Sequence, residues 1–168
     1  MADPASLIVC DATADDAPAV TAIYTHHVLH GTASFEVEPP TLAFWKIKIG
    51  ELTARGWPFL LATQASEVLG YAYATQFRDR TAYARTCENS IYVRHDAVGK
   101  GIGNQLMNVL VERAKQAGFR EIIAVIGGGE PASVALHAKC GFRHAGRMER
   151  VGEKFGRLLD TVYMQYSI

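Results

Sequence analysis

One carboxylate and one glycine-rich turn stand out in this sequence because of the chemistry that they could perform together. Glu88 lies in the run CENSIYV, and the segment VGKGIGN that follows carries glycine at every second position. A positioned carboxylate can remove a proton from a substrate. A turn without side chains that opens a helix exposes unpaired backbone N–H groups, which bind phosphate. The spacing therefore predicts an anion-binding turn close to a candidate general base.

The glycines of this turn are Gly99, Gly101 and Gly103, and Lys100 can add a positive charge beside a bound anion. Two common nucleotide-binding loops do not fit these residues. A Walker A loop requires Ser or Thr after the lysine, where Gly101 stands, and a dinucleotide fingerprint requires its third glycine at Asn104. The alternative that stays open is a glycine-rich turn that only caps a helix.

These residues must be positioned by a series of strands and helices. Apolar residues at helical spacing between capping and breaking residues predict helices, and short apolar runs between turns predict strands. The expected helices cover residues 13–30, 41–55, 102–117 and 131–140; the expected strands cover residues 6–10, 58–63, 68–77, 87–93 and 121–126, with two more on either side of residues 152–157. Because strands and helices are mixed throughout without repeats or linkers, we predict an α/β (α+β) fold in one domain, residues 1–168.

The composition narrows the partners of such a domain. The chain carries 17 Lys or Arg and 17 Asp or Glu, so the net charge is zero and no basic surface for nucleic acid is expected. Its apolar runs are much shorter than a membrane span and its N-terminus lacks a signal-peptide pattern, so we expect a cytoplasmic protein without a membrane segment. Three scattered cysteines indicate neither disulfides nor a zinc site, and His26 with His30 lacks further ligands, so no metal is expected.

The glycine turn and the helix after it resemble the acyl-CoA-binding motif of the GCN5-related N-acetyltransferases, the GNAT family. The match covers residues 98–103, with Val98 in place of the usual Arg or Gln. The segments GTASFEVEP, RTCENSIYV, PASVALHAKCGF and VGEKFGRLLD resemble the phosphinothricin and methionine-sulfoximine N-acetyltransferase branch. This resemblance implies a single-domain acyl-CoA N-acyltransferase fold, a mixed central sheet flanked by helices. It also implies acetyl-CoA as cosubstrate and acetylation of the α-amine of a small amino acid or amino-acid-like toxin.

The resemblance further implies residue roles in direct acetyl transfer within a ternary complex. Glu88 would be the general base, the backbone N–H of Val93 would stabilise the oxyanion, and His137 would protonate the leaving thiolate. The cofactor would enter between the strand that ends at Val93 and the strand at residues 121–126, which are expected to splay apart. The expected cofactor contacts are Val93, Arg94, His95, Gly99, Lys100, Gly101, Ile102, Gly103, Asn104, Gln105, Leu106, Ser133 and His137.

Recognition of the acceptor is expected to depend on charged and aromatic side chains near Glu88. Arginine binds a carboxylate or phosphinate through two parallel hydrogen bonds, and a positive cluster of Arg78, Arg80 and Lys154 disfavours cationic acceptors such as polyamines. The expected acceptor-binding residues are Phe35, Arg78, Arg80, Thr81, Ala82, Tyr83, Ser90, Tyr92 and Lys154.

Several alternatives stay open at the level of sequence. Glu88 could pair with an arginine, His137 could be a structural histidine, and the charged turn could simply be solvated. Departures from the family's pattern fall at Ala84, Val98, Glu130 and Leu158. The carboxylate of Glu130 would be unfavourable beside phosphates or pantetheine unless it turned outward. The family resemblance also admits acetylation of another amine, such as a protein N-terminus, or a non-catalytic acyl-CoA-binding regulatory domain, and it implies a homodimer.

Overall fold

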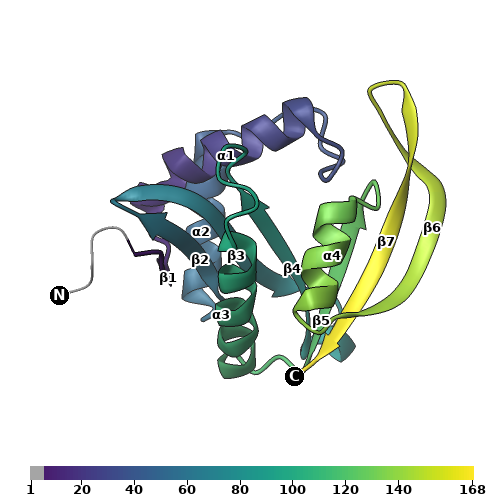
Figure 1. Cartoon of the computed structure of the whole chain (residues 1–168). Coiled ribbons are helices and arrows are strands. Elements are labelled where there is room, and N and C mark those ends of the chain that lie inside the picture. Colours follow the sequence, from purple (N-terminus) through teal and green to yellow (C-terminus); the bar gives the residue numbers. More distant parts are fainter. Residues whose placement is uncertain (1–5) are drawn as a thin grey trace.

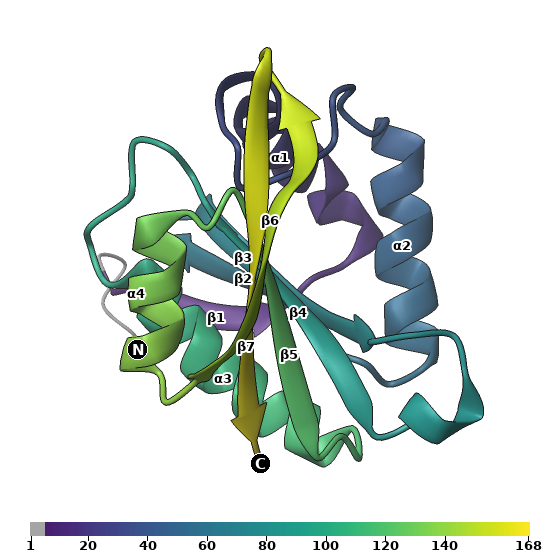
Figure 2. The ribbon, with the colours of Figure 1, turned by 90° about the vertical axis from the view of Figure 1, so that its right-hand side faces the viewer.

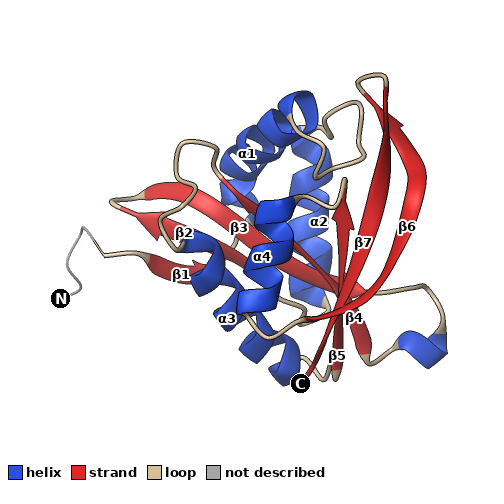
Figure 3. Cartoon of the chain, turned by 45° about the vertical axis from the view of Figure 1, so that its right-hand side comes forward, coloured by secondary structure: helices blue, strands red, loops and turns tan. Residues whose placement is uncertain are grey.

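The computed structural model of the chain describes residues 6–168, which form a seven-stranded sheet and four α-helices (Figures 1 and 3). The strands are β1 (Ile8–Asp11), β2 (Phe59–Gln64), β3 (Glu67–Gln76), β4 (Thr86–Val93), β5 (Glu121–Gly127), β6 (Arg143–Lys154) and β7 (Arg157–Ser167). The helices are α1 (Ala17–His30), α2 (Leu42–Ala54), α3 (Ile102–Gln116) and α4 (Pro131–Lys139), and two 3₁₀ turns cover Ala14–Asp16 and Thr81–Tyr83. None of the helices formed by residues 6–168 has the length and apolar character needed to cross a membrane.

The predicted helices and strands are confirmed, with small differences at their ends. The side chain of Thr41 accepts a hydrogen bond from the Phe44 N–H at 3.2 Å, so this residue caps α2 as its position in the sequence indicates. The first helix differs most, because residues 14–16 form a 3₁₀ turn and α1 begins at Ala17. Proline lacks an N–H and is tolerated in the first helical turn, so Pro18 favours a helix start at this point.

The sheet has the strand order β1-β2-β3-β4-β5-β7-β6, in which β4 and β5 are parallel and every other neighbouring pair is antiparallel. The pairing of β4 with β5 runs from Thr86–Glu121 to Asn89–Ala124 and stops there. Beyond that point β4 continues along β3 and β5 continues along β7. The two central strands therefore diverge over the second half of β4.

Helices cover both faces of the sheet (Figure 2). On one face, α1 and α2 bury an aromatic cluster that includes Trp45, Phe59 and Tyr71. On the other, α3 and α4 cover a mainly aliphatic cluster that includes Leu106 and Leu110. Full burial of each such side chain contributes about 1.5–3 kcal/mol to folding, so the two layers fix the helices relative to the central strands. This arrangement places the N-terminus of α3 at the divergence of β4 and β5.

The loop of residues 31–40, which follows α1, is held against the tip of the β6–β7 hairpin (Figure 1). The buried side chain of Lys154 donates a hydrogen bond from Nζ to the Ser34 carbonyl oxygen at 2.8 Å. Gly152 allows the ring of Phe35 to lie directly on the backbone of β6, because a Cβ there would overlap that ring. These contacts connect the loop to a hairpin more than 100 residues later in the chain.

Candidate active site

The divergence of β4 and β5 opens a gap where the sequence analysis placed the cofactor. The Arg94 N–H donates to the Leu69 carbonyl oxygen of β3 at 2.7 Å. Because successive N–H groups point to opposite sides of a strand, the N–H of Val93 points away from β3, toward the gap. The Val93 carbonyl faces the same way and accepts a hydrogen bond from His27 Nε2 at 2.7 Å. The backbone of Val93 is thus oriented as the predicted oxyanion donor must be.

A cavity of about 610 Å³, here called the cofactor cavity, occupies this gap beside the glycine turn. Gly99 and Gly101 have φ angles of +76° and +79°, and a Cβ at either position would meet no atom within 4 Å. Gly101 precedes α3, whose N-terminus has no side-chain cap. The first N–H groups of α3 therefore remain open to the cavity, a geometry that fits a diphosphate. The predicted residues that line this cavity are Val93, Gly99, Gly101, Ile102, Gly103, Asn104 and Ser133.

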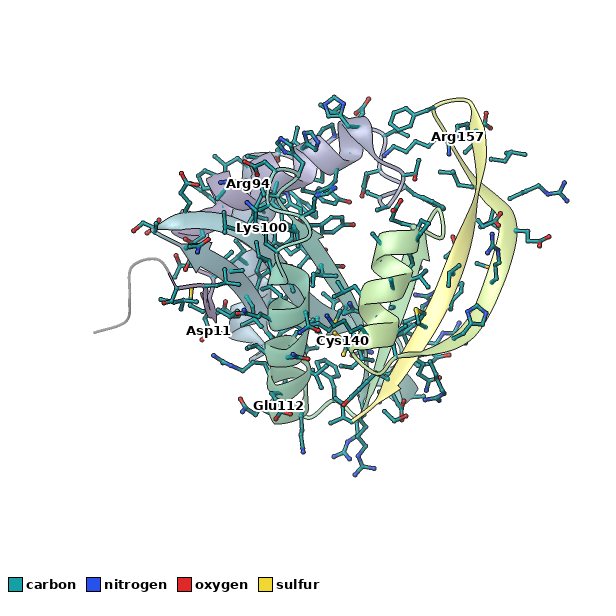
Figure 4. All side chains as sticks on the ribbon, viewed as in Figure 1. Asp11, Arg94, Lys100, Glu112, Cys140 and Arg157 are labelled. Carbon is teal, nitrogen blue, oxygen red and sulfur yellow. The ribbon has the colours of Figure 1, made fainter. Side chains whose placement is uncertain are left out.

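Two basic residues predicted to contact the cofactor lie outside the lining of this cavity. Arg94 forms ion pairs with Asp96 at 2.6 Å and with Glu67 at 3.1 Å. Lys100 lies in the same turn before α3, and its Nζ is 3.4 Å from the Asp96 carbonyl oxygen (Figure 4). Both side chains brace the turn in this structure, so a direct contact with the cofactor stays a prediction for them.

Three other predicted contacts are also directed elsewhere. The ring of His95 stacks on that of His26, with 3.9 Å between the ring centroids. Gln105 follows the lining residues into α3 without reaching the cavity, and Leu106 is buried in the core. Gln105 and Leu106 follow the lining residues directly in sequence, but a helix turns successive side chains to different sides.

The glycines at residues 127–129, which begin at the last residue of β5 and lie between the strand and the helix expected from the sequence, have a definite structural role. A Cβ at Gly127 would lie 2.8 Å from the Ala33 carbonyl oxygen, and one at Gly128 would lie 2.9 Å from Thr32 Oγ1. Thr32 and Ala33 both line the cofactor cavity. Glycine at these positions therefore lets the loop after α1 approach the end of β5 and form a wall of the site.

Other residues that line the cofactor cavity are distant in sequence from the glycine turn and were not predicted. His27 comes from α1, and Leu136 and Lys139 come from α4. No local spacing pattern marks them, because their position depends on how the two helices lie against the sheet. Glu130, a departure from the family pattern, does line the cofactor cavity, at the N-terminus of α4 where backbone N–H groups favour a negative charge.

A second cavity of about 530 Å³, here called the acceptor cavity, adjoins the first. Both cavities are lined by Ala33, Ile91, Tyr92 and Ser133, so they meet along the diverging half of β4. Of the predicted acceptor-binding residues, Phe35, Ser90 and Tyr92 line the acceptor cavity, and so does Glu88. The candidate base and the exposed N–H groups of the gap therefore face two connected spaces.

Glu88 lies in a partly desolvated environment with cations close by. Its Oε2 is 3.8 Å from Nη1 of Arg78. Burial raises the pKa of Glu88, while the charges of Arg78 and Lys48 act in the opposite direction. A carboxylate with a raised pKa accepts a proton more readily than one in water, which suits a general base. The pairing with an arginine that the sequence left as an alternative is present, but solvent screens it because the Arg78 side chain is 52% exposed.

The environment of His137 favours the structural alternative. The side chain is 2% exposed, and Nδ1 lies 2.7 Å from the Ser133 carbonyl oxygen. Because a carbonyl only accepts, Nδ1 carries the proton, and Nε2 accepts from Asn89 Nδ2 at 3.0 Å. Burial lowers the pKa of His137, which favours this neutral form. Donation of a proton to a thiolate would break one of these hydrogen bonds, so the geometry does not support the predicted acid role.

The predicted positive cluster does not form inside the acceptor cavity. Lys154 contacts the Ser34 carbonyl oxygen instead of facing the cavity, and burial lowers its pKa. Arg78 lies beside Glu88 and is 52% exposed. Of the remaining predicted residues, Thr81, Ala82 and Tyr83 form the exposed 3₁₀ turn and Arg80 precedes it. All four lie outside the cavity lining, and their contact with an acceptor stays a prediction.

Within residues 6–168, no group of three or more His, Cys, Asp or Glu side chains is arranged to hold a metal ion. His26 and His30 do lie together, with ring centroids 4.7 Å apart.

A family model described as an acetyltransferase (GNAT) domain matches residues 10–163. Phosphinothricin N-acetyltransferase of Alcaligenes faecalis is 47% identical over 152 residues, which cover 90% of this chain and 77% of that protein. The L-methionine sulfoximine/L-methionine sulfone acetyltransferase of Pseudomonas aeruginosa is 40% identical over 164 residues, which cover 97% of this chain and 95% of that protein.

The fold is also similar to that of solved structures. The crystal structure of a phosphinothricin acetyltransferase from Sinorhizobium meliloti in complex with acetyl-CoA superposes with a TM-score of 0.93 and 44% sequence identity. The superposition covers 96% of this chain and 88% of that one. A close relative with this fold thus binds the cosubstrate that the cofactor cavity fits.

Proposed function

The chain belongs to the GNAT acetyltransferase family, and we propose that it acetylates the α-amine of a small amino-acid-like acceptor. As a member of this family it is an acetyl-CoA-dependent N-acetyltransferase. The proposed acceptors are of the phosphinothricin, methionine sulfoximine or methionine sulfone type, after the relatives that carry these names. One observation carries the proposal: Glu88 lines the acceptor cavity, which joins the cofactor cavity along β4.

The cofactor cavity accounts for binding of acetyl-CoA through the backbone. The turn at Gly99 and Gly101 and the open N-terminus of α3 would hold the diphosphate, and the exposed edge of β4 would hold the pantetheine arm. Bound acetyl-CoA supplies the acetyl group as a thioester. The N–H of Val93 faces the same gap and would donate a hydrogen bond where negative charge develops on oxygen.

Glu88 prepares the acceptor for reaction. An α-amine is protonated at neutral pH and has no lone pair to attack with. Glu88 accepts one proton from this ammonium group and passes it to solvent, which leaves the nitrogen free to form the new C–N bond as the C–S bond breaks. The second proton that the nitrogen loses balances protonation of the thiolate. Because Glu88 must be ionised to act, activity is lost as the pH falls through its raised pKa.

Release of free thiol from acetyl-CoA, measured with a panel of amines, tests the proposal. We expect turnover with methionine sulfoximine, methionine sulfone or phosphinothricin. A preference for peptides with a free N-terminus would replace the proposed acceptor class with a protein substrate. Absence of thiol release with every amine would refute the proposed catalysis and favour a non-catalytic acyl-CoA-binding domain.

We also propose that the protein acts as a homodimer and that its one catalytic domain spans the entire chain. The hairpin of β6 and β7 presents exposed apolar side chains that a second copy would cover, namely Met148, Val151 and Leu158. Light scattering in solution tests this, and a monomeric mass would refute it. A cytoplasmic location stays a prediction.

A further inference from the structure

A second carboxylate, which the sequence analysis did not consider, lines the acceptor cavity. Glu36 lies in the loop that follows α1, and its backbone N–H donates to Ser34 Oγ at 3.1 Å. The same Oγ is 2.7 Å from the hydroxyl of Tyr24, and the Ser34 carbonyl accepts from Lys154. Ser34 is buried, so contacts with α1 and β6 fix the residue two positions before Glu36.

The carboxylates of Glu36 and Glu88 act on the same part of the cavity. Glu36, Glu88 and the phenol of Tyr73 all line this cavity. Burial raises the pKa of Tyr73 to about 12, a hydrogen bond with Ser90 opposes the rise, and the two negative charges add to it. Lys48, whose Nζ lies 4.6 Å from the centre of the Tyr73 ring, is likewise influenced by both carboxylates. Two acidic groups from different segments thus converge near one point.

The charge around this point favours a cation. Among the described residues that line the acceptor cavity, Glu36 and Glu88 are the charged carboxylates, and neither Lys nor Arg is present. Glu88 has Arg78 close by, at 3.8 Å. The side chain of Glu36 makes no hydrogen bond or ion pair within residues 6–168 and is exposed at the cavity. Lys48 and Lys154 interact with the charge of Glu36 from outside the cavity lining. Within the lining, Glu36 is the carboxylate without a close ion pair that an acceptor ammonium ion would meet.

We propose that Glu36 binds the ammonium group of the acceptor and holds it beside Glu88 before the proton is removed. This inference rests on the proposed function and assigns a further substrate-binding residue to it. The two carboxylates then have different roles: Glu36 provides affinity for the charged amine, and Glu88 accepts the proton. A site with one carboxylate would have to bind the cation and deprotonate it with the same group.

The substitution Glu36→Gln keeps the size of the side chain and removes its charge. Loss of a hydrogen bond between charged groups should raise the KM for the amine by roughly tenfold, with kcat at saturating amine almost unchanged. Glu38→Gln is the matched control, because Glu38 is an exposed carboxylate of the same loop that does not line the cavity. Unchanged affinity for acetyl-CoA in both variants would show that the fold is intact.

A competitive inhibitor that lacks the amine separates a charge contact from a change in cavity shape. The analogue of the best acceptor with hydrogen in place of its amino group should inhibit the wild type and Glu36→Gln equally. Equal loss of affinity for the amine and for this analogue would overturn the inference, as would an unchanged KM or a fall confined to kcat.

Failure of the proposed function would look different from failure of this inference. If the wild type acetylates another kind of amine, the acceptor class is wrong, and the same comparison of variants is then made with that amine. If a small amino acid is the acceptor and Glu36→Gln behaves like Glu38→Gln, the function stands and the role of Glu36 is refuted.

Discussion

The two cavities along β4 are built in different ways. The cofactor cavity depends on backbone: a contiguous stretch from Val93 to Asn104 supplies a strand edge, a glycine turn and the open end of a helix. The acceptor cavity depends on side chains, which come from α1 and the loop after it, from β3, β4, β5 and β7, and from α4. Backbone groups bind a common cosubstrate in the same way whatever the acceptor, whereas the dispersed side chains can vary with the amine. Changes to one cavity should therefore spare the function of the other.

The largest expected effect comes from Glu88→Gln, which tests whether the acceptor side performs the proton transfer. Removal of a positioned general base should lower kcat by about 10²- to 10⁴-fold. Affinity for acetyl-CoA, measured by calorimetry, should be nearly unchanged, because the carboxylate is outside the cofactor cavity lining. Parallel losses of turnover and of acetyl-CoA affinity would contradict the separation of the two cavities.

Gly101→Ala perturbs the backbone of the glycine turn that lines the cofactor cavity. At a φ of +79° an alanine is strained by about 1–2 kcal/mol, so we expect weaker acetyl-CoA binding and a lower thermal midpoint, with the relative preference among amines retained. Gly50→Ala is the control, because Gly50 lies in α2 with open space around it. Alanine favours helix there and should slightly stabilise the protein. A change in amine preference caused by Gly101→Ala would mean that the two cavities are coupled.

Lys154→Met tests whether a residue outside the lining of the acceptor cavity holds the loop that forms part of that lining. The variant loses the hydrogen bond from Nζ to the Ser34 carbonyl, which should loosen the loop that carries Phe35 and Glu36. Because a bond of this kind contributes about 1.5–3 kcal/mol, we expect a several-fold rise in the amine KM and little change in acetyl-CoA affinity. Lys46→Met, at an exposed position of α2, is the control in steady-state kinetics. Identical kinetics for both variants would assign no functional role to the Lys154 contact.

The smallest expected effect is electrostatic. Arg78 lowers the pKa of Glu88 against the effect of burial, so Arg78→Gln should raise that pKa. Since the base acts when ionised, the acid limb of the pH profile of kcat should move to higher pH. The exposure of Arg78 screens the interaction, and the shift should be a fraction of a pH unit. A shift to lower pH would exclude Glu88 as the group that titrates.

Sequence patterns were sufficient for the elements and for the cofactor turn, because both depend on neighbours in the chain. Helix caps such as Thr41, breakers such as Gly31 and Gly118, and the alternating glycines before α3 act within a few residues of their own positions. Sequence patterns were less informative about the side chains that line or support the acceptor cavity. Lys154 was expected to bind an anion, and its burial against Ser34 could not be read from the run GEKFGR.

The sequence by itself determined where the chain turns, where its helices begin and where bare backbone can meet a phosphate, since short-range sterics and hydrogen bonding govern these features. The tertiary structure decided how far β4 and β5 separate and which carboxylates share the acceptor cavity. It also decided that His137 is enclosed between Asn89 and Ser133. Such groups are brought together by sheet order and helix packing, which act over distances in the chain that no local spacing records.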